Sequence, residues 1–180
     1  MRVAAPLQKP FKRIYGKPCW QVKVGYGSFL TLEFGEPHLE IREPIVAKRV
    51  SRIVRHHLAR RMVTVHGDWH LWIYCCEWEV LSAGKHIGDS STKRKARIAA
   101  DFLDGRKLTA FTVSARTAQT VFKFERGTNL RTRPYDKSSE QWLLYEPSGM
   151  VLTTRADGRY SYGRSNASED RWKPIGTTSR

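Results

Sequence analysis

Polar and apolar residues alternate with period two along several short stretches of the chain. The pattern is clearest in residues 28–34 (Ser-Phe-Leu-Thr-Leu-Glu-Phe) and in residues 119–125 (Gln-Thr-Val-Phe-Lys-Phe-Glu). Successive side chains of a strand point to opposite faces, so this alternation predicts strands with one buried face. A glycine-containing turn and a further short strand follow each stretch, over residues 39–41 and 129–132.

The order of these elements recurs in the two halves of the chain and indicates an internal duplication. We therefore predict an α+β, β-rich protein built from two similar antiparallel β-units, packed face to face or side by side. The units would span residues 18–89 and 106–162. The other stretches that match between them are 20–24 with 108–113, 71–74 with 142–145, and 79–81 with 150–152.

The first unit contains a segment, residues 44–62, that has no counterpart in the second. It opens with Pro44 and has no further Gly or Pro, which predicts a helix over the whole segment. On a helical wheel its apolar and cationic residues separate, so we expect an amphipathic helix with a cationic outer face. The apolar arc consists of Val46, Val50, Ile53, Val54, His57, Leu58 and Met62. The cationic arc consists of Lys48, Arg49, Arg52, Arg55, His56 and Arg60.

A second helix is predicted from Thr92 to Leu103, within a linking segment that spans residues 90–105. Ser91 is placed to act as its N-cap, and Gly105 follows its end. Cations in the first turns of a helix oppose its dipole and so cost stability, which favours a binding role for them. These cations are Lys93, Arg94, Lys95 and Arg97.

The two ends of the chain differ from the predicted β-units. Residues 1–17 form a basic N-terminal segment. The polar sequence from residue 163 to residue 180 predicts a flexible tail, from which Trp172 could dock on the body. A chain of 180 residues suits one compact domain made of all these parts.

Basic residues greatly outnumber acidic ones. There are 32 Lys and Arg against 17 Asp and Glu, giving a formal net charge of +15 and a sequence pI of about 10.1. Residues 1–17 and 44–62 contain five and six cations and no acid, so together they hold eleven of these fifteen charges. An excess gathered in two segments indicates a polyanionic partner better than an even distribution would.

The compartment is predicted from the cysteines and from the absence of targeting signals. Cys19, Cys75 and Cys76 are an odd set with an adjacent pair, a poor framework for disulfides. No apolar run has the length of a signal peptide core or of a membrane span. We therefore expect a cytoplasmic protein without a membrane partner.

One short motif could bind a metal. In His66-Gly67-Asp68-Trp69-His70, a strand would place His66, Asp68 and His70 on one face, where they could ligate a divalent ion. The alternative is a turn at Gly67 and Asp68 with the two histidines merely beside it. No established zinc spacing supports the metal site, so we expect no cofactor.

The sequence favours a non-catalytic protein that binds the phosphate backbone of DNA or RNA, or a subunit of a nucleoprotein assembly. A protein–protein module, such as an inhibitor or immunity-type factor that recognises an acidic partner, is the first alternative. A metal-dependent hydrolase or nuclease using His66, Asp68 and His70 is the second. The predicted nucleic-acid contacts are Lys9, Lys12, Arg13, Lys48, Arg49, Arg52, Arg55, His56, Arg60, Lys93, Arg94 and Arg97.

Overall fold

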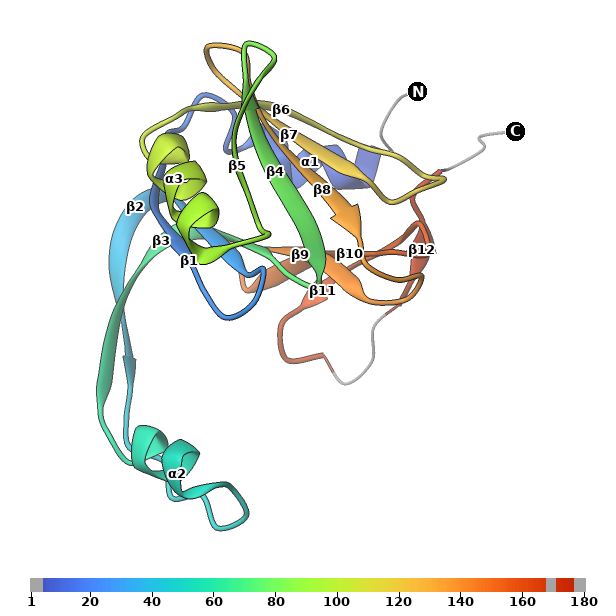
Figure 1. Ribbon diagram of the computed structural model, residues 1–180. Coiled ribbons are helices and arrows are strands. Elements are labelled where there is room, and N and C mark those ends of the chain that lie inside the picture. The colour runs from blue at the N-terminus through green and yellow to red at the C-terminus, as the bar shows by residue number, and fades with distance from the viewer. Residues whose placement is uncertain (1–4, 168–170, 177–180) are drawn as a thin grey trace.

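A computed structural model describes residues 5–167 and 171–176. It shows a β-rich α+β protein with two antiparallel sheets and three helices (Figure 1). The seven-stranded sheet contains, in spatial order, β1 (Cys19–Val24), β2 (Leu30–Arg42), β3 (Met62–Ile73), β9 (Glu140–Tyr145), β10 (Met150–Arg155), β11 (Arg159–Arg164) and β12 (Lys173–Pro174). The five-stranded sheet contains β5 (Lys85–Asp89), β4 (Cys76–Ser82), β8 (Thr128–Pro134), β7 (Thr120–Phe124) and β6 (Leu108–Val113).

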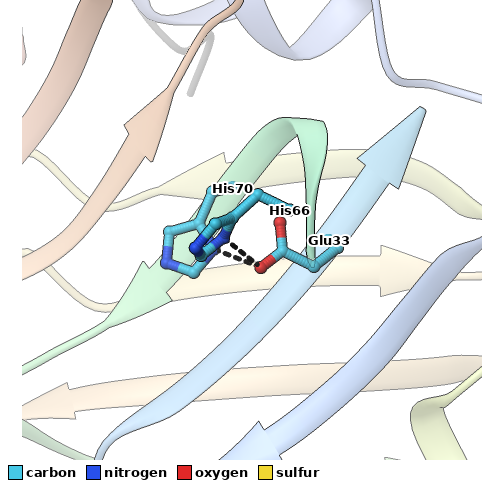
Figure 2. A group of neighbouring side chains, drawn as sticks. All are labelled: Glu33, His66 and His70. Carbon is cyan, nitrogen blue, oxygen red and sulfur yellow. Dashed lines mark hydrogen bonds and ion pairs between the residues drawn. The ribbon is translucent and has the colours of Figure 1, made fainter. Parts of the chain in front are cut away.

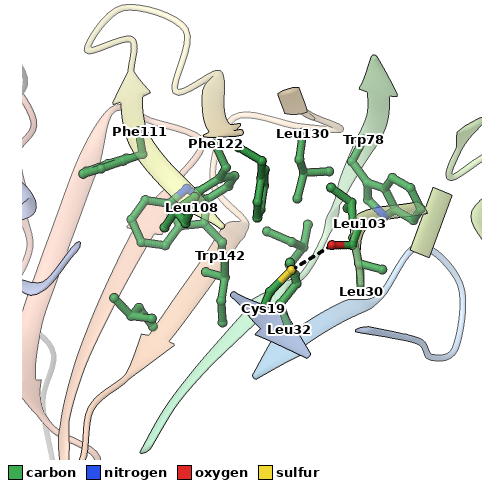
Figure 3. Close-up of a cluster of buried hydrophobic side chains, with 14 of the residues drawn as sticks. Cys19, Leu30, Leu32, Trp78, Leu103, Leu108, Phe111, Phe122, Leu130 and Trp142 are labelled. Atoms are coloured by element: carbon green, nitrogen blue, oxygen red, sulfur yellow. Dashed lines mark hydrogen bonds between the residues drawn. The ribbon is translucent and has the colours of Figure 1, made fainter. Parts of the chain in front are cut away.

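The hydrophobic core is built from the inward faces of both sheets (Figure 3). Leu32 on β2 and Leu144 on β9 come from the larger sheet, Phe122 on β7 comes from the smaller one, and all three are fully buried. Trp142 lies among them, and its indole N–H donates a hydrogen bond to the hydroxyl of Thr120 at 2.9 Å. Burial of alternate residues along these strands confirms the period-two pattern of the sequence.

Each sheet contains strands from both halves of the chain. Strand β3 pairs with β9, and β4 pairs with β8, so neither sheet is formed by one of the expected β-units over 18–89 and 106–162 alone. Residues 71–74 and 142–145, which we matched as equivalents, belong to strands that lie side by side with Leu71 opposite Leu144. Alternation identifies the buried face of a strand but not the strand that it pairs with, which is why the sequence did not reveal this arrangement.

The N-terminal segment contributes a helix that we did not predict, α1 (Ala5–Lys12). Its residues Leu7 and Phe11, with Ile14 just beyond it, are fully buried, while Lys9 and Lys12 are exposed. The spacing of these apolar residues fits one face of a helix. Pro10, which lies inside the helix, concealed that signal.

Helix α3 (Lys93–Leu103) confirms the second predicted helix to within one residue. Thr92 rather than Ser91 is the N-cap, and its hydroxyl accepts a hydrogen bond from the Lys95 N–H at 3.3 Å. The helix buries Ala96, Ala99, Ala100 and Leu103. Gly88 on β5 permits this packing, because a Cβ there would collide with the carbonyl oxygen of Lys95.

The outer parts of β2 and β3 form a two-stranded ribbon that extends away from both sheets, with α2 (Arg52–Leu58) at its end (Figure 1). We call residues 36–67 the arm and residues 43–61 its tip. Between the pairs Pro37↔Gly67 and Arg42↔Met62 the ribbon stays paired, which at about 3.4 Å per residue spans roughly 17 Å.

The helix at the tip is shorter than the one predicted over residues 44–62, and it does not begin at Pro44. Ser51 is the N-cap, and its hydroxyl accepts a hydrogen bond from the Val54 N–H at 3.3 Å. None of its residues is buried. The apolar residues Val46 and Ile53 are 89% and 83% exposed, so the apolar arc does not pack on the body.

The expected flexible tail is partly packed on the protein. Strand β12 pairs with β11, Ile175 is buried in the core, and Trp172 lies against the guanidinium of Arg155 at 4.6 Å. Residues 168–170 and 177–180 of the same segment lie outside the described residues. Within the described ranges, no helix has the length and apolar character needed to cross a membrane.

Candidate functional site

The tip of the arm presents a cluster of cations to solvent. Six of them are exposed: Lys48, Arg49, Arg52, Arg55, Arg60 and Arg61. Between residues 44 and 62 the sequence has no acid to neutralise them. In the described part of the chain, the tip contains one ion pair, in which Nε of Arg61 lies 2.9 Å from a carboxylate oxygen of Glu43. The cluster is therefore a concentrated positive charge held away from the body.

Backbone contacts hold α2 on the end of the ribbon. Arg42 on β2 donates from its guanidinium to the carbonyl oxygens of His57 at 3.1 Å and Leu58 at 3.3 Å. A cation at the C-terminus of a helix satisfies unpaired carbonyls and complements the helix dipole. The Ile45 N–H also donates to the Leu58 carbonyl, at 2.8 Å. These bonds fix the orientation of α2 on the ribbon.

The other predicted nucleic-acid contacts lie on different parts of the protein. Lys9, Lys12 and Arg13 lie on or next to α1, while Lys93, Arg94 and Arg97 lie on α3. Both helices belong to the body, away from the tip (Figure 1). Arg13 also forms an ion pair with Glu146 at 3.3 Å. The structure thus gathers the cations of residues 48–61 at one place and leaves the remaining candidates on other surfaces.

A second polar cluster lies at the root of the arm and joins Glu33 to the two predicted histidines (Figure 2). The Oε1 atom of Glu33 lies 2.7 Å from Nδ1 of His70 and 3.1 Å from Nδ1 of His66. His70 is directly opposite Glu33 in the β2–β3 pairing, and an irregularity in the register between Phe34 and Pro37 precedes the pair of His66 with His38. The carboxylate of Glu33 is buried, while both imidazoles are partly exposed.

Gly67 completes the environment of the Glu33 carboxylate. Its N–H donates to Oε2 of Glu33 at 3.0 Å. A Cβ on Gly67 would collide with the backbone of Phe34, so this close approach of the two strands requires glycine. Burial alone would raise the pKa of Glu33, but the hydrogen bond and charge of His70, with the bonds from Gly67 and His66, bring that pKa below its ordinary value.

Asp68 does not join the two histidines, although the sequence pattern grouped it with them. Its Oδ2 accepts a hydrogen bond from the Glu36 N–H at 2.9 Å. Glu33 stands in its place, from a strand more than thirty residues earlier in the chain. The signal for Glu33 lies in the pairing register of β2 with β3, which the order of residues does not disclose.

A hollow of about 460 Å³ opens beside this cluster. His38, His66 and His70 line it from the arm and its root, and Tyr145 and Glu146 line it from β9 and the following turn. The Nε2 atom of His66 lies 3.2 Å from a carboxylate oxygen of Glu40. The cluster therefore faces a polar space that solvent can enter.

Comparisons of this chain with protein-family models, with curated proteins and with solved structures found no match. A functional conclusion consequently depends on the geometry of the two clusters described above.

A larger hollow, of about 640 Å³, lies over the five-stranded sheet, and its charged groups are already paired. Four of its charged side chains pair with one another: Glu77 with Arg133, and Glu79 with Arg131 at 3.8 Å. The fifth, Asp89, pairs with Lys95 at 3.4 Å. Exposed pairs of this kind neutralise each other and contribute little beyond local order. We therefore place no candidate site there.

Two of the three cysteines are unsuited to nucleophilic chemistry. Cys19 and Cys76 are buried and free, and burial raises the pKa of the Cys19 thiol to about 12 and raises the pKa of the Cys76 thiol as well. The Cys19 thiol donates to the carbonyl oxygen of Leu103 at 3.1 Å (Figure 3). A nucleophilic cysteine acts as a thiolate, so both residues are structural.

Proposed function

We propose that this protein binds nucleic acid through its arm, as a non-catalytic binding protein or as a subunit of a nucleoprotein assembly. The observation that carries the proposal is the exposed cationic cluster at the tip, which a ribbon holds roughly 17 Å beyond the body. Cations that neutralise several phosphates release counterions and so produce affinity that falls with salt. Such contacts give little sequence preference.

The form of the arm supports contact with a duplex or with a folded nucleic acid. The major groove of DNA admits a two-stranded ribbon or a single helix, and the arm combines both. Five of the six tip cations are arginines, whose planar guanidinium can donate two parallel hydrogen bonds to one phosphate. The cations on α3 lie on the body and would contact only a ligand that bends back or extends past the arm.

We also propose that the two halves of the chain arose by duplication. The strands that correspond in the structure differ from the stretches that the sequence pattern matched. The order β1-β2-β3-β9-β10 in one sheet becomes β6-β7-β8-β4-β5 in the other when the halves are exchanged. Trp78 on β4 and Trp142 on β9 then correspond, and each is buried with its indole N–H hydrogen-bonded.

The β2–β3 hairpin corresponds to β7–β8, which a short turn over residues 125–127 connects. An experimental structure in which β1–β5 and β6–β10 fail to superpose would contradict this proposal.

In this correspondence the arm is an addition to one half of a duplicated framework. The framework folds without an arm in its second half, so packing does not explain why the first half has one. This supports a binding role for residues 36–67.

The apolar side chains of the arm favour a second candidate function, recognition of an acidic protein surface. Leu39 is 64% exposed and Val63 is 57% exposed, and both lie on the ribbon that leads to the cations. Apolar residues beside a charged patch suit a protein interface, in which charge steers association and apolar burial stabilises the complex. A complex that survives nuclease treatment would favour this candidate over nucleic acid.

The proposal is tested by reversing charge at the tip and at a matched location on the body. The tip variant is Arg49→Glu, Arg52→Glu and Arg60→Glu, and the control is Lys85→Glu, Lys123→Glu and Arg126→Glu, three exposed cations outside the arm. Both variants have the same net charge, so a bulk electrostatic effect would weaken both equally.

We expect the tip variant to lose roughly tenfold or more in affinity for duplex DNA or structured RNA. A tenfold loss corresponds to about 1.4 kcal/mol of binding free energy. The control should retain affinity close to that of the parent. Equal losses in the two variants, or no binding by the parent at low salt, would contradict the proposal.

A further inference from the structure

The cluster at the root of the arm has the composition of a metal centre. We propose that Glu33, His66 and His70 together bind a divalent transition metal, with Zn²⁺ the best fit, and leave one coordination position open to solvent. Neither nucleic-acid binding nor the cationic tip enters this inference.

The three side chains are already gathered as a metal would need them. One ligand atom from each lies within 4.8 Å of the other two, and the carboxylate oxygen is 2.7 Å and 3.1 Å from the two Nδ1 atoms. Zinc binds imidazole nitrogen and carboxylate oxygen at about 2.0–2.2 Å, so an ion between the three groups requires only a small outward movement of the imidazoles. The two rings, whose planes lie at 86° to each other, both approach the same carboxylate oxygen of Glu33 (Figure 2).

The surroundings of the ligands support them as a second layer. Oε2 of Glu33 is held by the Gly67 N–H, which leaves Oε1 directed at the histidines. The Nε2 atom of His66 lies 3.2 Å from Oε2 of Glu40, an arrangement in which a carboxylate orients a histidine whose other nitrogen binds metal. Such partners fix the tautomer and the direction of the ring.

The donor set decides between metals. Two imidazoles and one carboxylate suit Zn²⁺ and neighbouring transition metals, whereas Ca²⁺ and Mg²⁺ require more oxygen ligands. Three protein ligands with a fourth position open to water are typical of zinc sites that act on a ligand, because purely structural sites are closed by four side chains. Here the open position would face the 460 Å³ hollow that His38, Tyr145 and Glu146 line.

The position of the site gives the metal a structural consequence. Glu33 belongs to the part of β2 in the body, and His66 belongs to the arm. A bound ion would therefore cross-link the two strands at the point where the ribbon leaves the sheet, and would hold the root of the arm rigid.

The test is metal titration of the untagged full-length protein after removal of metals with a chelator. We expect saturable binding of one Zn²⁺ per chain. The binding is monitored by competition with a chromophoric chelator. Co²⁺ should give a visible spectrum of a bound, low-coordinate ion. His66→Ala with His70→Ala should weaken binding by at least a hundredfold, and Glu33→Gln should weaken it less but measurably.

The matched control is His56→Ala with His57→Ala, which removes two exposed histidines from the tip. It should bind Zn²⁺ as the parent does. Circular dichroism and thermal unfolding without metal establish that each variant folds. If a variant fails to fold, His70→Gln serves in its place, because it retains the size and a polar group. Absence of one-to-one binding in the parent, or equal loss in the control, would overturn the proposal.

Discussion

Arg42 on the ribbon donates a hydrogen bond to the carbonyl oxygen of His57 in α2 at 3.1 Å. This bond, with the adjacent one to Leu58, joins the tip helix to the strand that carries it. It makes the orientation of the cationic cluster depend on a residue outside that cluster.

Arg42→Lys should therefore weaken nucleic-acid binding without changing charge. The lysine keeps one positive charge but cannot donate to two carbonyls in the fixed geometry of a guanidinium. We expect a loss of roughly 3- to 10-fold in affinity, corresponding to about 1 kcal/mol for a hydrogen bond. Amide exchange at Ala59, whose N–H donates to the Arg55 carbonyl, should accelerate. Faster exchange without weaker binding would show that the orientation of α2 is irrelevant to affinity.

Removing most of the arm should leave a folded body. Replacing residues 39–65 by Asn-Gly closes a two-residue hairpin between His38 and His66, which are paired in the ribbon. In the part of the chain that the structure describes, the hydrophobic core has no member from 36–67. We expect cooperative thermal unfolding within a few degrees of the parent and no nucleic-acid binding.

The same shortened protein separates the two proposals. It retains Glu33, His66 and His70, so it should still bind Zn²⁺, although the loss of Glu40 removes the partner of His66. Retained nucleic-acid binding would place the interface on the body, and α3 would become the next surface to test.

Helix α1 should be an integral part of the core. Phe11 is fully buried, and its ring centroid lies 4.0 Å from that of Phe111 and 5.4 Å from that of Trp142. Phe11→Ala should lower the free energy of unfolding by about 3–5 kcal/mol, because it leaves a cavity in a closely packed cluster. Lys12→Ala, at the exposed neighbouring position, should change it by less than about 0.5 kcal/mol. Denaturant unfolding measures both, and a small effect of Phe11→Ala would mean that α1 is not docked.

The buried thiols should make the protein less stable at alkaline pH. The pKa of Cys19 in the folded state is raised to about 12 from an ordinary value of 9.0, mainly because the thiol is buried. A group with a raised folded-state pKa contributes stability that is complete below its unfolded pKa and is lost as pH rises toward the folded value. Stability should consequently begin to fall near pH 9, and Cys19→Ala should reduce the slope. Urea midpoints between pH 7 and pH 10 test this, and an unchanged slope in Cys19→Ala would contradict it.

The sequence predicted local features better than pairings between distant segments. The strands around Leu32 and Phe122 and the helix α3 were all indicated by periodicity and capping residues. The two-sheet arrangement was not, because the partner of a strand depends on contacts between segments far apart in the chain. Glu33 was missed for the same reason, since its neighbour His70 lies 37 residues away.

The tip helix shows how charge can be predicted more easily than placement. The acid-free composition of residues 44–62 identified the cationic cluster. The apolar residues of the same segment suggested a helix packed on the body, but Ile53 is 83% exposed at the end of a ribbon. An amphipathic pattern reports that a face avoids water, and it does not distinguish the protein's own core from a partner.

The salt dependence of binding tests the central claim most directly. Affinity for a duplex of fixed length is measured from low to moderate salt for the parent, the tip variant and the matched body control. Each phosphate contact contributes about −0.9 to the slope of log K against log salt. The account predicts a slope for the tip variant that is shallower by about 2 to 3 than those of the parent and the control. Parallel lines for all three proteins would contradict it, because they would mean that Arg49, Arg52 and Arg60 contact no phosphate.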